Sequence, residues 1–147
     1  MLFNSQTSDS DTDNAGENRR ADKRFDPDIP EGETVTETFE LPYHATIENV
    51  SVRFYPGPQL TLEVLPFRET PDGDRLPLVD VIGERDTLVG DDDSFTFDVS
   101  EPVRRGDTIG VIFENNGDHT YRAPVDIEVD RHGGIRRTVT SVMEVFR

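Results

Sequence analysis

The chain has 147 residues, of which 31 are aspartate or glutamate and 15 are arginine or lysine, so its formal net charge is -16 at pH 7. It contains no cysteine and no run of eighteen apolar residues, which excludes disulfide bonds, thiolate metal sites and a membrane-spanning helix. The negative charge also argues against nucleic acid as a general partner, because phosphate backbones would be repelled.

Residues 1–32 form a polar first segment. This composition buries too little apolar surface to offset the entropy of ordering, so we expect an N-terminal arm that is either flexible or ordered by a neighbouring molecule. The second interpretation needs anchors, and the segment offers two aromatic rings and four cations. These candidate interface residues are Phe3, Phe25, Arg19, Arg20, Lys23 and Arg24.

Residues 33–147 change to a period of two, which is typical of half-buried strands. The clearest alternating runs are 34–41, 50–54, 60–64, 95–99, 109–113, 125–129 and 139–146. Weaker runs at 78–82 and 87–89 bring the expected total to eight or nine strands. Turn signals separate them at 56–58, 71–74, 115–118 and 132–134. The pattern predicts an all-β domain, folded as a single β-sandwich with the jelly-roll topology.

Two turns are specified more closely by their residues. In the stretch 95–113, Gly106 allows a tight reversal, Asp107 caps it and Ile109 restarts the buried face. This phrase resembles the lead-in to a late strand in jelly rolls of carbohydrate-binding modules, receptor-ligand trimers and viral capsid proteins. Further along, Asn116-Gly117 suits the positive φ angles of a tight hairpin turn.

Acidic clusters raise the question of a calcium site. Residues 9–13 begin like an EF-hand loop, but Asn14 replaces the required glycine and Arg20 replaces the twelfth-position glutamate. Residues 91–93, and the pair Asp72 and Asp74, could hold calcium in a loop. Such clusters also arise from adaptation to salt, which is the interpretation that we favour, and no metal or other cofactor is expected.

Catalytic motifs are not apparent. The three histidines, His44, His119 and His132, lie far apart in the sequence without metal-ligand spacing. No Gly-x-Ser-x-Gly elbow is present, and no pair of carboxylates is singled out among 31 acids. We therefore expect a protein that is not an enzyme.

The C-terminal segment is basic on an acidic body. Residues 131–147 hold four arginines against one acid, a net of +3, whereas residues 33–130 hold 22 acids and 7 arginines, a net of -15. The segment could pair with an acidic strand of its own domain. It could instead contact another subunit, since arginine binds carboxylates in a fork geometry. We favour the interface slightly, with Arg131, Arg136 and Arg137 as its residues.

The chain combines a large excess of acids with fourteen arginines and a single lysine, Lys23. This composition resembles that of proteins from extreme halophiles, the haloarchaea and their viruses. With the expected jelly roll and arm, the chain resembles single-jelly-roll capsid proteins. The resemblance implies a minor capsid, vertex (penton) or head-decoration protein of a haloarchaeal virus. It would form a homo-oligomeric ring, contact neighbouring capsid proteins and reside in the virion after assembly in the host cytoplasm.

A carbohydrate-binding module on the same sandwich is the alternative function. Such modules display aromatic rings that stack on sugars. This chain has no tryptophan, and its best candidates are Tyr43 and Tyr55, which flank one predicted strand and could share an edge.

Overall fold

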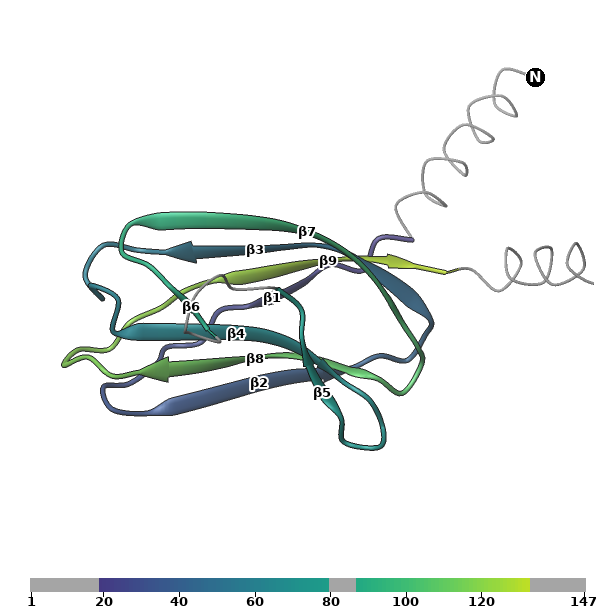
Figure 1. The fold of residues 1–147 in the computed structure, drawn as a ribbon, viewed down its shortest axis with the longest axis horizontal. Helices are drawn as coiled ribbons and strands as arrows, with labels where there is room; N and C mark the ends of the chain where they lie inside the picture. Colours follow the sequence, from purple (N-terminus) through teal and green to yellow (C-terminus); the bar gives the residue numbers. More distant parts are fainter. Residues whose placement is uncertain (1–18, 80–86, 133–147) are drawn as a thin grey trace, which may run out of the picture.

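The computed structural model describes residues 19–79 and 87–132, and these form two packed β-sheets (Figure 1). No helix that could cross a membrane occurs in these ranges. The first sheet has the order β1-β9-β3-β7. Its strands are β1 (Lys23–Phe25), β9 (Val125–Arg131), β3 (Ala45–Phe54) and β7 (Asp93–Val103).

The second sheet has the order β2-β8-β4-β5 and lies against the first. Its strands are β2 (Thr34–Glu40), β8 (Thr108–Asn115), β4 (Leu62–Glu69) and β5 (Arg75–Pro77), and the short β6 (Leu88–Val89) also pairs with β4. Every pair in both sheets is antiparallel.

The connections make this sandwich a jelly roll. The chain crosses to the other sheet between β1 and β2, between β2 and β3, and again between β3 and β4. It does so again at each step from β6 to β7, from β7 to β8 and from β8 to β9. Sequence neighbours therefore face each other across the core, as a jelly roll requires. The predicted fold class is confirmed.

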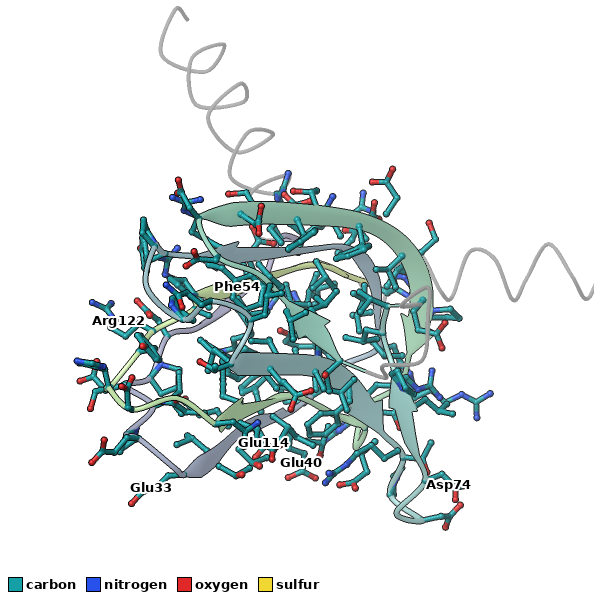
Figure 2. All side chains as sticks on the ribbon, turned by 60° about the vertical axis from the view of Figure 1, so that its left-hand side comes forward. Glu33, Glu40, Phe54, Asp74, Glu114 and Arg122 are labelled. Atoms are coloured by element: carbon teal, nitrogen blue, oxygen red, sulfur yellow. The ribbon has the colours of Figure 1, made fainter. Side chains whose placement is uncertain are left out.

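The period-two runs supply the core. In β3, Val50, Val52 and Phe54 point inward and are at most 1% exposed, while Ser51 and Arg53 face outward. Strands β4, β8 and β9 contribute alternate buried residues in the same way. Figure 2 shows charged side chains projecting from the outside of both layers. The alternation thus separates an apolar interior from a charged outer surface.

One aromatic ring is buried on the outer face of the second sheet. By the alternation of β4, Phe67 falls on the outward-facing side of the strand, yet it is fully buried. The guanidinium of Arg75 lies 4.3 Å from its ring centroid. It packs where Gly110 leaves the space, since a Cβ at Gly110 would lie 2.7 Å from the Phe67 ring. Gly110 is therefore needed for close packing.

The predicted arm must be corrected where the structure describes it. Residues 19–32 belong to the sandwich: β1 pairs with β9, and the segment buries Phe25 and Ile29 in the core. The main-chain N–H of Ile29 also donates to the carbonyl of Tyr121. Two apolar side chains and a strand ladder outweigh the polar composition. Residues 1–18 lie outside the described ranges, so the arm itself stays a prediction for them.

The two turns have opposite outcomes. Gly106 has φ +96° and the Asp107 carboxylate accepts the Arg104 N–H at 2.8 Å, as predicted. The prediction of a tight hairpin at Asn116-Gly117 is wrong, because β8 and β9 lie in different sheets and are connected by residues 116–124. Gly117 is instead required for space, since a Cβ there would lie 2.6 Å from the Thr61 hydroxyl.

Candidate interaction surfaces

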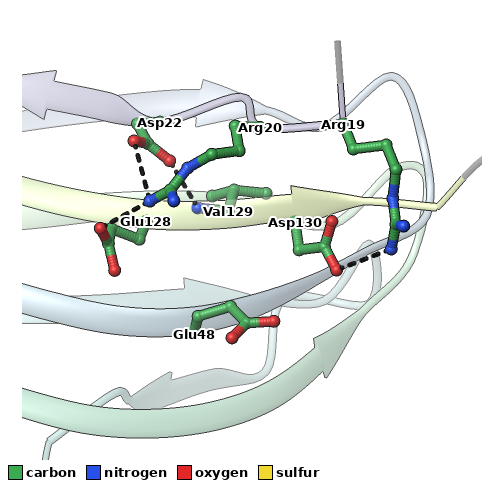
Figure 3. A pocket seen from close by; sticks show the side chains of 7 residues that line it. All are labelled: Arg19, Arg20, Asp22, Glu48, Glu128, Val129 and Asp130. Carbon is green, nitrogen blue, oxygen red and sulfur yellow. Dashed lines mark hydrogen bonds and ion pairs between the residues drawn. The ribbon is translucent and has the colours of Figure 1, made fainter. Parts of the chain in front are cut away.

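The predicted basic cluster lies along the outer face of β9. Arg19 pairs with Asp130 at 3.2 Å, and Arg20 pairs with Glu128 at 2.7 Å (Figure 3). Arg24 continues this series with Asp126 at 3.1 Å. Exposed pairs of this kind are worth up to about 1 kcal/mol each and are weakened by salt. The three arginines therefore help to hold residues 19–24 on their own domain.

A shallow hollow of about 350 Å³ opens beside these ion pairs. Its floor includes the bulge in β3, where the ladder registers shift and Glu48 is exposed. The Asp22 carboxylate accepts the main-chain N–H of Val129 at 3.2 Å. The hollow is lined by Arg19, Arg20, Asp22, Glu48, Glu128, Val129 and Asp130 (Figure 3). Two cations against four acids leave it acidic.

The other predicted interface residues in the described ranges also contact their own domain. Phe25 is only 5% exposed and packs in the core, so its assignment as an anchor on a neighbour is corrected. The Lys23 ammonium lies 3.7 Å from the ring centroid of Phe39 on β2 and bridges the two sheets. Phe3, Arg136 and Arg137 lie outside the described residues, and their interface roles stay predictions.

Arg131 lies over Tyr43 at the end of the sandwich where β9 ends. Its guanidinium carbon is 5.6 Å from the Tyr43 ring centroid. Partial burial raises the pKa of the Tyr43 phenol, and the positive charge of Arg131 lowers it in part. Tyr43 and Tyr55 stand before and after β3, so they mark its opposite ends, and the suggestion that they share an edge is wrong.

The opposite end of the sandwich forms a loop cluster that the sequence did not single out. It comprises residues 26–33, 55–61 and 116–124, the connections that follow β1, β3 and β8. Tyr55 and Leu60 are 42% and 52% exposed there. The Tyr121 hydroxyl donates to the Gly57 carbonyl at 3.3 Å, so Tyr121 joins two of these loops. We call this surface the loop end.

The loop end holds a strained turn. Gln59 and Leu60 have φ values of 50° and 69°, and the Thr61 N–H closes the turn on the Pro58 carbonyl at 2.9 Å. Both central residues therefore adopt positive φ without being glycine or asparagine, which is uncommon and costs about 1–3 kcal/mol each. The turn presents the Leu60 side chain to solvent. The Pro-Gly-Pro at 56–58 signalled a loop, but no residue type signalled this conformation.

Asn115 organises the base of the loop end. It is 1% exposed, and its amide nitrogen donates to the carbonyls of Ile29 at 2.9 Å and His119 at 2.7 Å. Its side-chain oxygen accepts the Gly117 N–H at 2.9 Å. Nearby, hydrogen bonds from Arg122 to Asp26 join two of the loops and raise the pKa of that guanidinium.

The acidic loop 91–93 directs its carboxylates to different donors. Asp91 accepts the Gly57 N–H at 2.7 Å, Asp92 pairs with Arg53 at 2.8 Å, and Asp93 accepts the Asp91 N–H at 2.9 Å. Within residues 19–79 and 87–132, histidines and acids do not gather in threes with a geometry suited to a metal ion. The Asp92 carboxylate holds this loop to β3, and the Asp91 carboxylate holds it to the loop that follows β3.

Comparisons with known proteins add the following. No protein-family model and no curated protein matches this sequence. The solved structure of FlhE is 14% identical and covers 77% of this chain and 98% of its own, with a TM-score of 0.42. A chain of the infectious bursal disease virus particle is 14% identical over 79% of this chain and 32% of its own, with a TM-score of 0.42.

A third similar structure is CBM32-1 from a family 31 glycoside hydrolase of Clostridium perfringens. It is 10% identical and covers 74% of this chain and 76% of its own, with a TM-score of 0.39. Viral capsid jelly rolls and a carbohydrate-binding sandwich thus both occur among the structural neighbours. All three TM-scores lie below 0.5, so these similarities carry no argument about function.

Proposed function

We propose that this protein is a non-enzymatic structural subunit that assembles with other copies of itself in concentrated salt. The observation that carries the proposal is the open side of the sandwich at β7. Among residues 19–79 and 87–132, this strand of eleven residues ends its sheet and pairs only with β3, and its Phe95, Phe97 and Val99 are partly exposed. An unpaired edge beside apolar side chains is a ready contact surface between subunits.

The charge of the chain supports assembly at high ionic strength. In dilute buffer, a net charge of -16 on each copy opposes contact between them. In about 1 M salt the Debye length is near 3 Å, so repulsion between separated charges is screened. Apolar contacts at the β7 edge then remain effective while the acidic outer faces stay hydrated.

The finer proposal is a virion component of a haloarchaeal virus. The jelly roll would serve as a rigid block in a ring at a vertex (penton), or as a minor or decoration subunit, and residues 1–18 would contact the neighbouring shell. Support comes from the halophilic composition and from the open edge. The protein would then reside in the virion after assembly in the host cytoplasm.

Light scattering tests self-assembly directly. The full chain in about 2 M KCl, where screening is nearly complete, should show a mass that is a multiple of 16.6 kDa. The same sample at low salt should shift toward the monomer, since repulsion returns. A mass of 16.6 kDa at every salt and protein concentration would contradict the proposal.

The loop end favours the alternative, a carbohydrate-binding module. Tyr55 is 42% exposed, and Tyr121 lies against the same loop. Exposed tyrosine rings can stack on sugar rings. Binding of the monomer to polysaccharide, lost in Tyr55→Ala and kept in Tyr43→Ala at the other end, would favour this function over assembly.

A further inference from the structure

The outer strands of the two sheets, β1, β7, β2, β5 and the two-residue β6, differ in how well their edges are closed. Strands β1 and β5 have only three residues each. Strand β2 has seven, but its alternation places Glu37 on the inward face between Val35 and Phe39. An inward charge on an edge strand discourages addition of another strand. Among the strands that the structure describes, β2 is therefore protected and β7 is the exception.

Strand β7 is closed over only part of its length. Ser100 has φ 51° beside the bulge opposite β3, and Pro102 has no N–H to donate. Arg68 of β4 also reaches this part, donating to the Glu101 carboxylate and to the Pro102 carbonyl, both at 2.7 Å. Residues 93–98 keep a regular ladder with β3, and residues 93–99 contain no positive φ, no proline and no contact with Arg68.

The open stretch carries aromatic side chains on its inner side and carboxylates near its ends. Phe95 and Phe97 stack with ring centroids 6.3 Å apart, and Phe54 meets Phe95 edge-on at 6.0 Å. Asp93 and Asp98 stand at its two ends. A strand that completes this edge should be apolar along one face, rich in β-branched residues and positively charged.

The C-terminal segment of the chain has this character. Residues 136–147 contain three arginines against one glutamate, and residues 138–146 hold three valines and two threonines without proline or glycine. A second β7 is the less suitable occupant, because its own Asp93 and Asp98 would meet like charges. The 15 residues after His132 can extend about 50 Å at ~3.3 Å each, enough to leave the domain.

We infer that residues 138–147 of one copy add as a strand to the 93–99 edge of β7 in a neighbouring copy. The inference rests on the proposed self-assembly and names the surfaces that it uses. Arg131, Ala45 and Val103 lie in register across the sheet, so β9 ends level with the closed part of β7, with β3 between the two strands. The segment of the same copy would reach the Arg68 contacts with Glu101 and Pro102 before it reached residues 93–99. The segment of a neighbouring copy can approach residues 93–99 directly from the side.

Single-cysteine chains test the contact, because the natural chain has no cysteine. Thr96→Cys places a thiol on the exposed outer face of the open edge. Ser141→Cys and Val142→Cys place one on either face of the added strand. Facing residues on paired strands have Cβ atoms about 4.5–5.5 Å apart, close to disulfide range. Full-length Thr96→Cys is mixed with each partner in about 2 M KCl under mild oxidation.

The expected product is a disulfide-linked heterodimer with one of the two partners, formed about tenfold faster than with the matched control Thr36→Cys. Thr36 is an exposed, outward threonine on the protected strand β2. Equal rates with both threonine positions would overturn the choice of edge. A predominant Thr96–Thr96 dimer would show that two β7 edges meet. A chain that carries both Thr96→Cys and Ser141→Cys and forms only an intramolecular disulfide would show that the segment pairs with β7 of its own copy, which would overturn the inference.

Light scattering of the wild type separates this inference from the proposed function. Oligomers that form without any heterodimeric cross-link would overturn the inference and leave self-assembly standing. A monomeric wild type would remove both. As a second readout, Arg136→Glu with Arg137→Glu should weaken association about tenfold, and adding Asp98→Arg should restore it, whereas adding Glu40→Arg on β2 should not.

Discussion

The placement of Phe25 in the core makes a quantitative prediction. The side chain is 5% exposed and packs with the hydrophobic cluster, so Phe25→Ala removes most of a buried ring. Phenylalanine-to-alanine changes in cores cost about 3–5 kcal/mol of unfolding free energy. Because β1 is a three-residue strand at the edge of its sheet, we expect roughly 3 kcal/mol, at the low end of that range.

Urea unfolding followed by far-UV circular dichroism, in about 2 M KCl, measures this loss. Leu60→Ala is the control, because Leu60 is 52% exposed and its truncation should change stability by less than about 0.5 kcal/mol. A Phe25→Ala effect as small as that of the control would refute the docking of residues 19–32 and restore a boundary at residue 32.

Further predictions concern the loop end, the outer face, salt and pH. Asn115→Ala removes the side-chain donor to the His119 carbonyl and the acceptor of the Gly117 N–H, while the Ile29 carbonyl keeps the Tyr121 N–H, so the change should cost roughly 3 kcal/mol in the same unfolding assay. Gly110→Ala places a Cβ 2.7 Å from the Phe67 ring and should cost about 1–3 kcal/mol. The melting temperature should fall steeply from about 1 M KCl to dilute buffer, and a flat curve would contradict the repulsion argument. The hydrogen bond from His119 lowers the pKa of the Asp118 carboxyl from 3.8, so its small contribution is present above that pH and is lost as pH falls through the lowered pKa. An NMR titration should show this pKa return toward 3.8 in His119→Ala, and an unchanged pKa would argue against the hydrogen bond.

The strands were predictable because burial of one face imposes a period of two. Residues 95–99 and 125–129 show this plainly, and both lie in strands whose inner residues are buried or half-buried. Strand β1 escaped detection because three residues cannot show a period, and its neighbours are charged. A signal did exist: Asp126, Glu128 and Asp130 alternate along the outer face of β9, and their partners are the arginines of residues 19–24.

Strand order and the loop end depend on contacts between distant residues. The sequence favoured a jelly roll through Gly106 and Asp107, but the pairing of β9 between β1 and β3 follows from which edges fit together in the folded core. The positive φ at Gln59 and Leu60 is imposed by the surrounding loops against the preference of both residues. The predicted hairpin at Asn116-Gly117 failed because Gly117 does not serve a turn with positive φ. It is a glycine because a Cβ there would collide with the Thr61 hydroxyl.

Residue-resolved hydrogen–deuterium exchange at increasing protein concentration in about 2 M KCl tests the account most directly. If copies assemble through the open edge, amides within 93–99 whose N–H groups face away from β3 should exchange more slowly as concentration rises. Those of β2 that face away from β8 should stay unchanged. Exchange at β7 that is independent of concentration while the mass increases would contradict assembly through this edge.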